Sequence, residues 1–234
     1  MRAFLTYILL FISSVAMAGQ ETVNFTTKDG CRIEAYYSAA SSGALVFINT
    51  HGLGSDKNEW GSFQKALGER GYGWLSLDLR GHGGSGTCGG KKADYRNFSK
   101  ADWANASRDL EAAAAWLKKK GVPAKRLVFC GASIGANLSV KAARAAGPAA
   151  VILLSPGLDY AGLKPEKYFP GGAYRVLIAA AQDDPYAWQS ALPLFKAARA
   201  GHAAATLDGI SGHGVNMFKA PKVIPAVLDW AAGK

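Results

Sequence analysis

The chain has 234 residues, of which 49% are hydrophobic and 19% charged, and its formal net charge is +10 at pH 7. This length is enough for one domain with a full hydrophobic core. The basic residues are scattered rather than arranged in a stripe with aromatic residues, so nucleic acid is not an expected partner. No cysteines or histidines have metal-ligand spacing, and no metal site is expected.

The first 18 residues have the composition of a cleaved signal peptide. Arg2 is followed by the apolar run 3–12, and Ala16-Met17-Ala18 is the small-x-small pattern of a signal-peptidase site. A first core strand or a membrane anchor is the alternative, but the apolar run is too short to span a bilayer comfortably. We therefore expect a signal peptide over 1–18, a single domain over 19–234, and a periplasmic or secreted protein without stable membrane insertion.

Strand-like and helix-like segments alternate along most of the remaining chain. The expected strands are 22–27, 32–38, 44–49, 73–79, 127–131, 149–155, 175–181 and 204–207. The expected helices are 58–70, 100–120, 134–146, 188–200 and 215–232. Continuous apolar strands such as 151–154 indicate a sheet buried on both faces, which is mostly parallel and covered by helices. The expected fold class is an α/β sandwich.

A G-x-S-x-G pentapeptide, residues 131–135, lies between an expected strand and an expected helix. A serine at such a sharp turn projects its hydroxyl above the sheet, and the flanking glycines leave room for the turn. Ser133 is therefore the candidate nucleophile. The backbone amide of Ile134, at the start of the helix, is a candidate donor to an oxyanion formed on Ser133.

A serine nucleophile needs a general base, and the chain has four histidines. His51 and His82 lie in glycine-containing turns after early strands and are interpreted as structural. His202 precedes the last strand and is expected at the far edge of the sheet from Ser133. His213 follows the last strand in a glycine-flanked loop, so His213 is the expected base.

Two carboxylates follow the last-but-one strand and are candidates to orient the base. Pro185 fixes a turn that would direct Asp184 toward the histidine loop, so Asp184 is favoured, with Asp183 expected to bond the backbone. Asp159 remains a less favoured alternative. Asp78, at the end of an earlier strand, is expected to hold the turn at 80–84.

The loop after the strand 44–49 reads His-Gly-Leu-Gly over residues 51–54. Its glycines allow a close approach of the backbone, which makes the Leu53 amide a candidate second oxyanion donor. An ordinary flexible turn is the alternative interpretation of this loop.

Residues 51–54 (HGLG), 77–85 (LDLRGHGGS) and 131–135 (GASIG) together resemble the α/β-hydrolase superfamily, in particular lidless esterases and dienelactone-hydrolase-like serine hydrolases. The order serine, acid, histidine also matches, and the resemblance covers nearly all of 19–234. It implies an α/β-hydrolase fold with a mostly parallel eight-stranded sheet flanked by helices.

The resemblance also bears on the three cysteines. Cys130 ends a central strand and is expected to be a buried thiol, which leaves Cys31 and Cys88 for pairing in an oxidising compartment. The second strand of this family is antiparallel and neighbours the fourth, an arrangement that implies a Cys31–Cys88 disulfide.

Many family members carry a helical lid after the sixth strand, but only 156–174 separate the sixth and seventh strands here. We therefore expect no large lid and an open site. Its candidate substrate contacts are aromatic or apolar, with core packing as the alternative for each: Trp60, Tyr160, Tyr168, Phe169 and Met217.

The expected function is that of an exported serine hydrolase, a carboxylesterase acting on a small-molecule ester through a Ser-His-Asp triad without a cofactor. A serine peptidase or thioesterase would use the same triad. A non-catalytic binding protein on the same fold is the alternative from another class. The sequence leaves the oligomeric state open.

Overall fold

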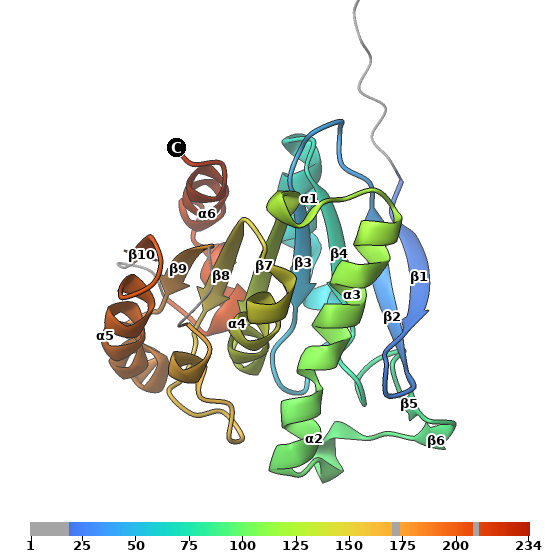
Figure 1. Cartoon of the computed structure of the whole chain (residues 1–234). Helices are drawn as coiled ribbons and strands as arrows, with labels where there is room; N and C mark the ends of the chain where they lie inside the picture. Colours follow the sequence, from blue (N-terminus) through green and yellow to red (C-terminus); the bar gives the residue numbers. More distant parts are fainter. Residues whose placement is uncertain (1–18, 170–173, 208–210) are drawn as a thin grey trace, which may run out of the picture.

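A mixed sheet of ten strands forms the centre of the computed structural model, which describes residues 19–169, 174–207 and 211–234 (Figure 1). The expected signal peptide lies outside these residues. The strand order is β10-β9-β8-β7-β3-β4-β2-β5-β6, with β1 paired to β2. The strands are β1 (Glu21–Thr26), β2 (Cys31–Ser38), β3 (Val46–Thr50), β4 (Gly73–Leu77), β5 (Thr87–Cys88), β6 (Lys91–Lys92), β7 (Leu127–Ala132), β8 (Ala150–Leu154), β9 (Arg175–Ala179) and β10 (Ala204–Leu207).

Six α-helices and five short 3-10 helices connect the strands of the described chain. The α-helices are α1 (Gly61–Glu69), α2 (Lys100–Asn105), α3 (Ser107–Lys119), α4 (Ile134–Ala146), α5 (Pro185–Arg199) and α6 (Val223–Ala231). The 3-10 helices are η1 (Lys57–Trp60), η2 (Tyr95–Asn97), η3 (Ala124–Arg126), η4 (Pro165–Lys167) and η5 (Gly214–Lys219).

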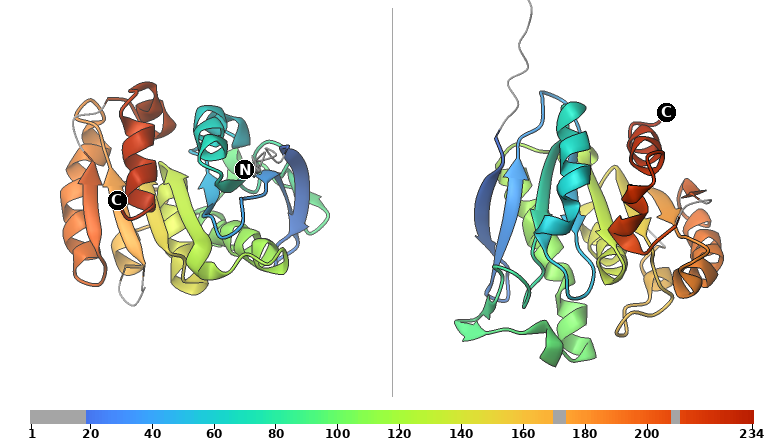
Figure 2. Two further views of the ribbon diagram at one scale, coloured as in Figure 1. Left: turned by 90° about the horizontal axis from the view of Figure 1, so that it is seen from above. Right: turned by 180° about the vertical axis from the view of Figure 1, so that it is seen from behind.

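The sheet is covered by helices on both faces, as Figure 2 shows from above. α1 and α6 pack on one face, while α3, α4 and α5 pack on the other. Successive residues of β7 alternate between the two cores: Phe129 faces α3 and α4, whereas Val128 and Cys130 face α1 and α6. Since every residue of β3, β4, β7 and β8 is buried, the expected double-sided burial is confirmed.

Most expected elements match the structure closely, and the expected α/β-hydrolase fold is confirmed. The expected helix 134–146 coincides with α4. The expected helix 100–120 is two helices, because the chain bends at Ala106 between α2 and α3. The two-residue strands β5 and β6 were not expected, since two residues carry no readable period.

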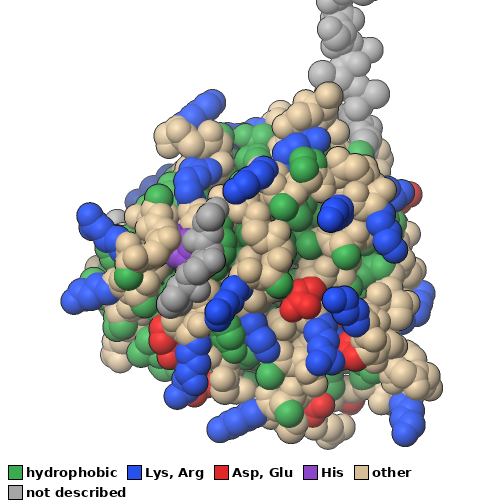
Figure 3. Space-filling view, in the orientation of Figure 1, with side chains coloured by type: hydrophobic (Ala, Val, Ile, Leu, Met, Phe, Trp, Pro, Cys, Tyr) green, Lys and Arg blue, Asp and Glu red, His purple; other side chains and the backbone are tan. Residues whose placement is uncertain are grey.

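The carboxyl ends of the parallel strands meet at the lower edge of the sheet in Figure 1. The segment 80–106 extends beyond this edge and carries β5, β6, η2 and α2. Lys and Arg side chains are spread over the face in Figure 3 rather than gathered in one patch.

Buried charges hold the start of this segment. Asp78 accepts hydrogen bonds from the amide of Gly84 (2.7 Å) and from Lys57 Nζ (2.7 Å), so its expected role in holding the turn is confirmed. Arg80 donates to Asp109 on α3 (2.8 Å) and to Asp29 in the β1–β2 turn (2.8 Å). The Arg80 guanidinium lowers the pKa of the Asp29 carboxyl. The contact with Asp29 ties the opening hairpin to the edge, and the contact with Asp109 ties α3 to it.

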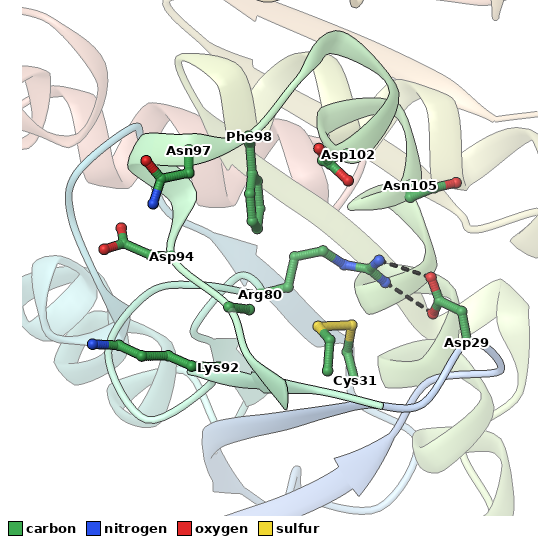
Figure 4. A pocket seen from close by; sticks show the side chains of 11 residues that line it. Asp29, Cys31, Arg80, Lys92, Asp94, Asn97, Phe98, Asp102 and Asn105 are labelled. Atoms are coloured by element: carbon green, nitrogen blue, oxygen red, sulfur yellow. Dashed lines mark hydrogen bonds and ion pairs between the residues drawn. A yellow bond between two sulfur atoms is a disulfide. The ribbon is translucent and has the colours of Figure 1, made fainter. Parts of the chain in front are cut away.

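A disulfide joins Cys31 at the start of β2 to Cys88 in β5, and Figure 4 shows it beside Arg80 in a cavity of about 550 Å³. The two cysteines are also cross-strand partners in the antiparallel β2–β5 pair. That pair has only two residues on each strand, and the disulfide adds a covalent link between the β5–β6 hairpin and the sheet. Cys130 is a buried free thiol, and burial raises its pKa.

We predict that reducing this disulfide lowers the free energy of unfolding by about 4 kcal/mol, because the cross-link closes a loop of 57 residues in the unfolded chain. Urea unfolding with and without dithiothreitol measures the difference. The double variant Cys31→Ser/Cys88→Ser is the control and should not respond to the reductant. Equal wild-type stability in both buffers would contradict the prediction.

Candidate active site

Ser133 lies at the turn between β7 and α4, with a backbone φ of 56° and ψ of −124°. A positive φ is rare for a residue with a side chain, and it persists only where the surroundings impose it. A Cβ at Gly131 would overlap the carbonyl of Gly135, and a Cβ at Gly135 would overlap the carbonyl of Thr50. Both glycines are therefore required by close backbone contacts, as the pentapeptide predicts.

The loop at residues 51–54 lies against Ser133, since a Cβ at Gly52 would stand 3.5 Å from the Cβ of Ser133. The Leu53 side chain is 60% exposed, so this residue contributes its backbone rather than a buried side chain. Ile134 is the first residue of α4, where an amide has no acceptor within the helix. The amide of Ile134 is thus not used within α4.

Glu59 on η1 holds this loop, and the sequence analysis missed it. Its carboxylate accepts a hydrogen bond from the amide of Gly52 at 3.2 Å. Burial raises the pKa of Glu59, while hydrogen bonds from Ser55 and Gly52 and the charge of His213 oppose that shift. Gly52 lies in a loop and Glu59 in η1, so no helix or strand period relates the two residues and the sequence carries no signal for this contact.

His213 and Asp184 form a hydrogen-bonded pair, with 2.7 Å between Nδ1 and Oδ2. The Asp184 side chain is 12% exposed and that of His213 is 47% exposed, so the carboxylate lies beneath the ring. Asp183 instead accepts from the amide of Gly212 at 2.9 Å. Asp159 accepts from the amide of Gly162 at 2.6 Å and makes no contact with His213.

Ser155, directly after β8, anchors the loop of His213. Its Oγ accepts a hydrogen bond from the amide of Gly214 at 2.9 Å, and its backbone φ is 51°. A Cβ at Gly214 would stand 3.2 Å from the Cβ of Ala132, so the histidine loop packs beside the residue that precedes Ser133. The expected strand 149–155 included Ser155, whereas β8 ends at Leu154 and leaves Ser155 in the loop.

Within the described residues no hydrogen bond joins Ser133 to His213. The two side chains belong to neighbouring loops of one sheet edge, and bonds of this kind often form only when substrate is bound. The Ser133 side chain lies close enough to Tyr160, in the loop after β8, to act on the pKa of its phenol.

The other histidines have structural contacts. His51 is fully buried, and its ring bonds the carbonyl of Gly52 (2.7 Å) and the amide of Leu79 (2.9 Å). Burial lowers the pKa of His51 to about 4, so the ring is neutral at pH 7. His82 stacks on Tyr95 with 3.9 Å between ring centroids. His202 contacts the carbonyl of Phe169, at the opposite end of β10 from His213.

Three of the five expected substrate contacts are wrong. The side chains of Trp60, Phe169 and Met217 have no exposed surface, because each fills the core under the helices rather than the site. Trp60 packs against Phe63 and Phe218 between the sheet and α1.

The two tyrosines differ in position. Tyr168 is half-buried, and its ring centroid lies 5.9 Å from Lys141 Nζ on α4. Tyr160 is half-buried beside Ser133.

The described residues contain no group of three or more His, Cys, Asp or Glu side chains that could hold a metal ion. In the same part of the chain, every helix is too short or too polar to cross a bilayer. The cavity of Figure 4 lies beside the disulfide, and its lining does not include Ser133, Asp184 or His213.

Comparisons with known proteins identify a matching family model and two related sequences. Residues 40–184 match the model of a family described as serine aminopeptidase, S33. Two uncharacterized proteins from strains of Mycobacterium tuberculosis are 30% identical over 148 residues, which make up 62% of this chain and 48% of each relative. The chain therefore spans about half the length of these curated relatives.

Solved structures with the same architecture include two hydrolases. An esterase of Pyrococcus furiosus has a TM-score of 0.72 at 16% identity, with 92% of this chain and 90% of the esterase covered. A dienelactone hydrolase of Anabaena variabilis has a TM-score of 0.69 at 16% identity, with 93% and 97% covered. At this identity the similarity shows the fold. Because the family model covers more than half of the chain and the fold agrees with it, the chain belongs to the serine aminopeptidase S33 family of the α/β-hydrolase superfamily.

Proposed function

We propose that this protein is a serine hydrolase that cleaves carboxylic esters through an acyl-enzyme on Ser133. The observation that carries the proposal is the His213–Asp184 pair, with 2.7 Å between Nδ1 and Oδ2, in a loop packed beside the serine turn. A pair of this kind keeps the second ring nitrogen of the histidine free to accept a proton. The esterases among the structures of the same fold support the choice of ester substrates.

In the first half of the reaction, His213 Nε2 takes the proton of Ser133 as Oγ bonds the carbonyl carbon of the ester. The negative charge moves to the carbonyl oxygen, where the amides of Leu53 and Ile134 donate hydrogen bonds to it. His213 then gives its proton to the departing alcohol oxygen. Asp184 stabilises the imidazolium and holds the ring in the required tautomer.

In the second half, His213 takes a proton from water while the water oxygen attacks the acyl carbon. The same amides stabilise the second tetrahedral intermediate. The bond between the acyl carbon and Oγ breaks, His213 returns its proton to Oγ, and the acid leaves. The protein's own residues supply every group that this sequence of steps requires.

A serine aminopeptidase is the second candidate, because the family model carries that description. It would use the same three side chains on an amide, whose nitrogen must be protonated before it leaves. A thioesterase is chemically equivalent to the esterase at this site. The panel of substrates below separates these reactions.

We also propose that residues 1–18 are removed as a signal peptide and that residues 19–234 act as one domain in the periplasm or outside the cell. The positive residue, apolar run and small-x-small site support this proposal. The disulfide between Cys31 and Cys88 supports it as well, since such bonds persist in oxidising compartments.

The first prediction from this proposal concerns Ser133. Ser133→Ala should lower kcat/KM for p-nitrophenyl esters by roughly ten-thousandfold, because the nucleophile is lost. A panel from acetyl to palmitoyl esters, with aminoacyl p-nitroanilides alongside, measures the rates and identifies the preferred bond. Faster cleavage of the anilides would favour the aminopeptidase. A folded protein that cleaves no substrate and is not labelled by a fluorophosphonate would favour a binding protein instead.

The second prediction concerns the neighbouring carboxylates. Asp184→Asn should lower kcat roughly a thousandfold or more, because the amide no longer stabilises the protonated ring of His213. Asp183→Asn is the matched control: it keeps an acceptor for the Gly212 amide and should cost less than about tenfold. Equal losses in the two variants would argue against Asp184 as the acid.

The third prediction concerns export. Full-length chain expressed in a Gram-negative host should be recovered from the periplasm with Gly19 as its first residue, as intact mass measures. Ala18→Phe should block this cleavage, because signal peptidase requires a small residue before the cut. Recovery of uncleaved wild-type protein from the cytoplasm would contradict the proposal.

A further inference from the structure

Tyr160 stands beside the candidate nucleophile, in the loop that follows β8. Its hydroxyl donates a hydrogen bond to the carbonyl of Ser155 at 3.3 Å, a long distance for a bond of this type. The amide of Ser133 donates to the carbonyl of Leu154, the residue before Ser155, at 2.8 Å, so the serine turn and the phenol lie against adjacent residues. The Ser133 side chain and the charge of Asp184 both act on the pKa of this phenol. A polar side chain is therefore placed at the reacting atom, in addition to the three of the triad.

The loop that carries Tyr160 is fixed to the helix that begins after Ser133. Asn137 on α4 is fully buried, and its Nδ2 donates to the carbonyls of Gly157 (2.9 Å) and Leu163 (2.9 Å). Its Oδ1 accepts from the amide of Gly157 at 3.2 Å. Because Asn137 is one helical turn from Ser133, these bonds set the position of the loop relative to the nucleophile.

The ring of Tyr160 is held as well. A Cβ at Gly157 would overlap the rings of both Tyr160 and Tyr186, so the glycine makes room for them. The two rings pack edge to face with 5.5 Å between centroids. The Tyr186 hydroxyl accepts from the amide of Asp159 (2.9 Å) and donates to its carbonyl (3.0 Å), which fixes the backbone next to Tyr160.

The phenol of Tyr160 carries its proton at neutral pH. Burial raises its pKa to about 12, and the negative charge of Asp184 adds to this effect, while the hydrogen-bonding Ser133 hydroxyl opposes it. A neutral phenol is a hydrogen-bond donor, whereas an ionised one would repel a developing negative charge.

We propose that Tyr160 is a further catalytic residue, whose hydroxyl donates a hydrogen bond to Ser133 Oγ while that oxygen carries negative charge. This inference rests on the proposed function. As Ser133 gives its proton to His213 and bonds the acyl carbon, the phenol hydrogen turns from the Ser155 carbonyl to Oγ. The long bond to the neutral carbonyl is weak, so the exchange costs little, and a charged acceptor gains more from the donor.

The same contact acts again when the acyl-enzyme breaks down. The electron pair of the bond between the acyl carbon and Oγ then moves to Oγ, which receives the proton of His213. Tyr160 stabilises Oγ as this charge forms and returns its hydrogen bond to Ser155 afterwards. The phenol keeps its proton throughout, so no proton is gained or lost at Tyr160.

Tyr160→Phe tests the inference, because it keeps the ring and removes only the hydroxyl. We expect kcat on the best ester to fall roughly 10- to 100-fold with KM changed less than about threefold, the effect of one hydrogen bond to a charged oxygen. The rate of Ser133 labelling by a fluorophosphonate should fall by a similar factor. Tyr186→Phe is the matched control, since its hydroxyl holds the same loop without reaching Ser133, and it should stay within about threefold of wild type.

Three results would overturn the inference. Unchanged kcat and labelling rate in folded Tyr160→Phe would exclude the hydrogen bond but leave the proposed function standing. An equal loss in Tyr186→Phe would assign the effect to loop position. Full activity in Ser133→Ala, or no labelling of folded wild-type protein, would reject the proposed function and this inference together.

If Tyr160→Phe does not fold, a fluorinated tyrosine at position 160 replaces it. Its phenol is more acidic, so kcat should decline as the pH rises through the lowered pKa, at values where wild type keeps its rate. If Tyr160 had only a structural role, fluorination would not shift the pH at which kcat declines. Identical profiles for the two proteins would overturn the inference.

Discussion

The close backbone contact between the serine turn and the end of β3 is the constraint on which the rest of the site depends. Gly135 lies against the carbonyl of Thr50, and Gly131 lies against the carbonyl of Gly135, so neither position tolerates a side chain. This contact draws α4 onto the sheet and forces Ser133 to a positive φ. The strain is offset by the burial of β7 and α4 on both sides of the turn, where all of β7 and nine of the 13 residues of α4 are buried.

Hydrogen bonds between loops then bring polar side chains from distant parts of the chain to the same edge of the sheet. Ser155 after β8 holds the backbone beside His213, while Asp183 and Asp184 after β9 hold that loop and its ring. Asn137 on α4 holds the loop that carries Tyr160. Each contact joins a residue to a loop 20 to 59 positions away, so the site depends on the register of the parallel strands. A shift of one strand would separate the side chains that meet at this edge.

The part of this edge that carries the segment 80–106 is stabilised by ion pairs and by a disulfide rather than by apolar packing. Asp78, Lys57 and Arg80 are buried, yet each has an oppositely charged partner, which removes most of the cost of burying a charge. The disulfide ties β5 to β2 where only two residues pair. This part also supports the loop of Leu53, because the amide of Gly54 donates a hydrogen bond to the ring of His82 at 3.4 Å. The loop of Leu53 is therefore supported from both the sheet and the segment 80–106.

The sequence by itself determined the order of the longer strands and most helices, the double-sided burial of the sheet and the serine turn, because these depend on local periodicity and on glycines at fixed spacing. The same reasoning favoured Asp184 over Asp183, and the structure has Asp184 facing His213. Only the tertiary structure decided which polar and aromatic groups surround Ser133. Trp60, Phe169 and Met217 turned inward because large apolar side chains gain most from burial. Glu59, Ser155 and Asn137 act through contacts between loops far apart in sequence, and no local pattern specifies the partner of such a side chain.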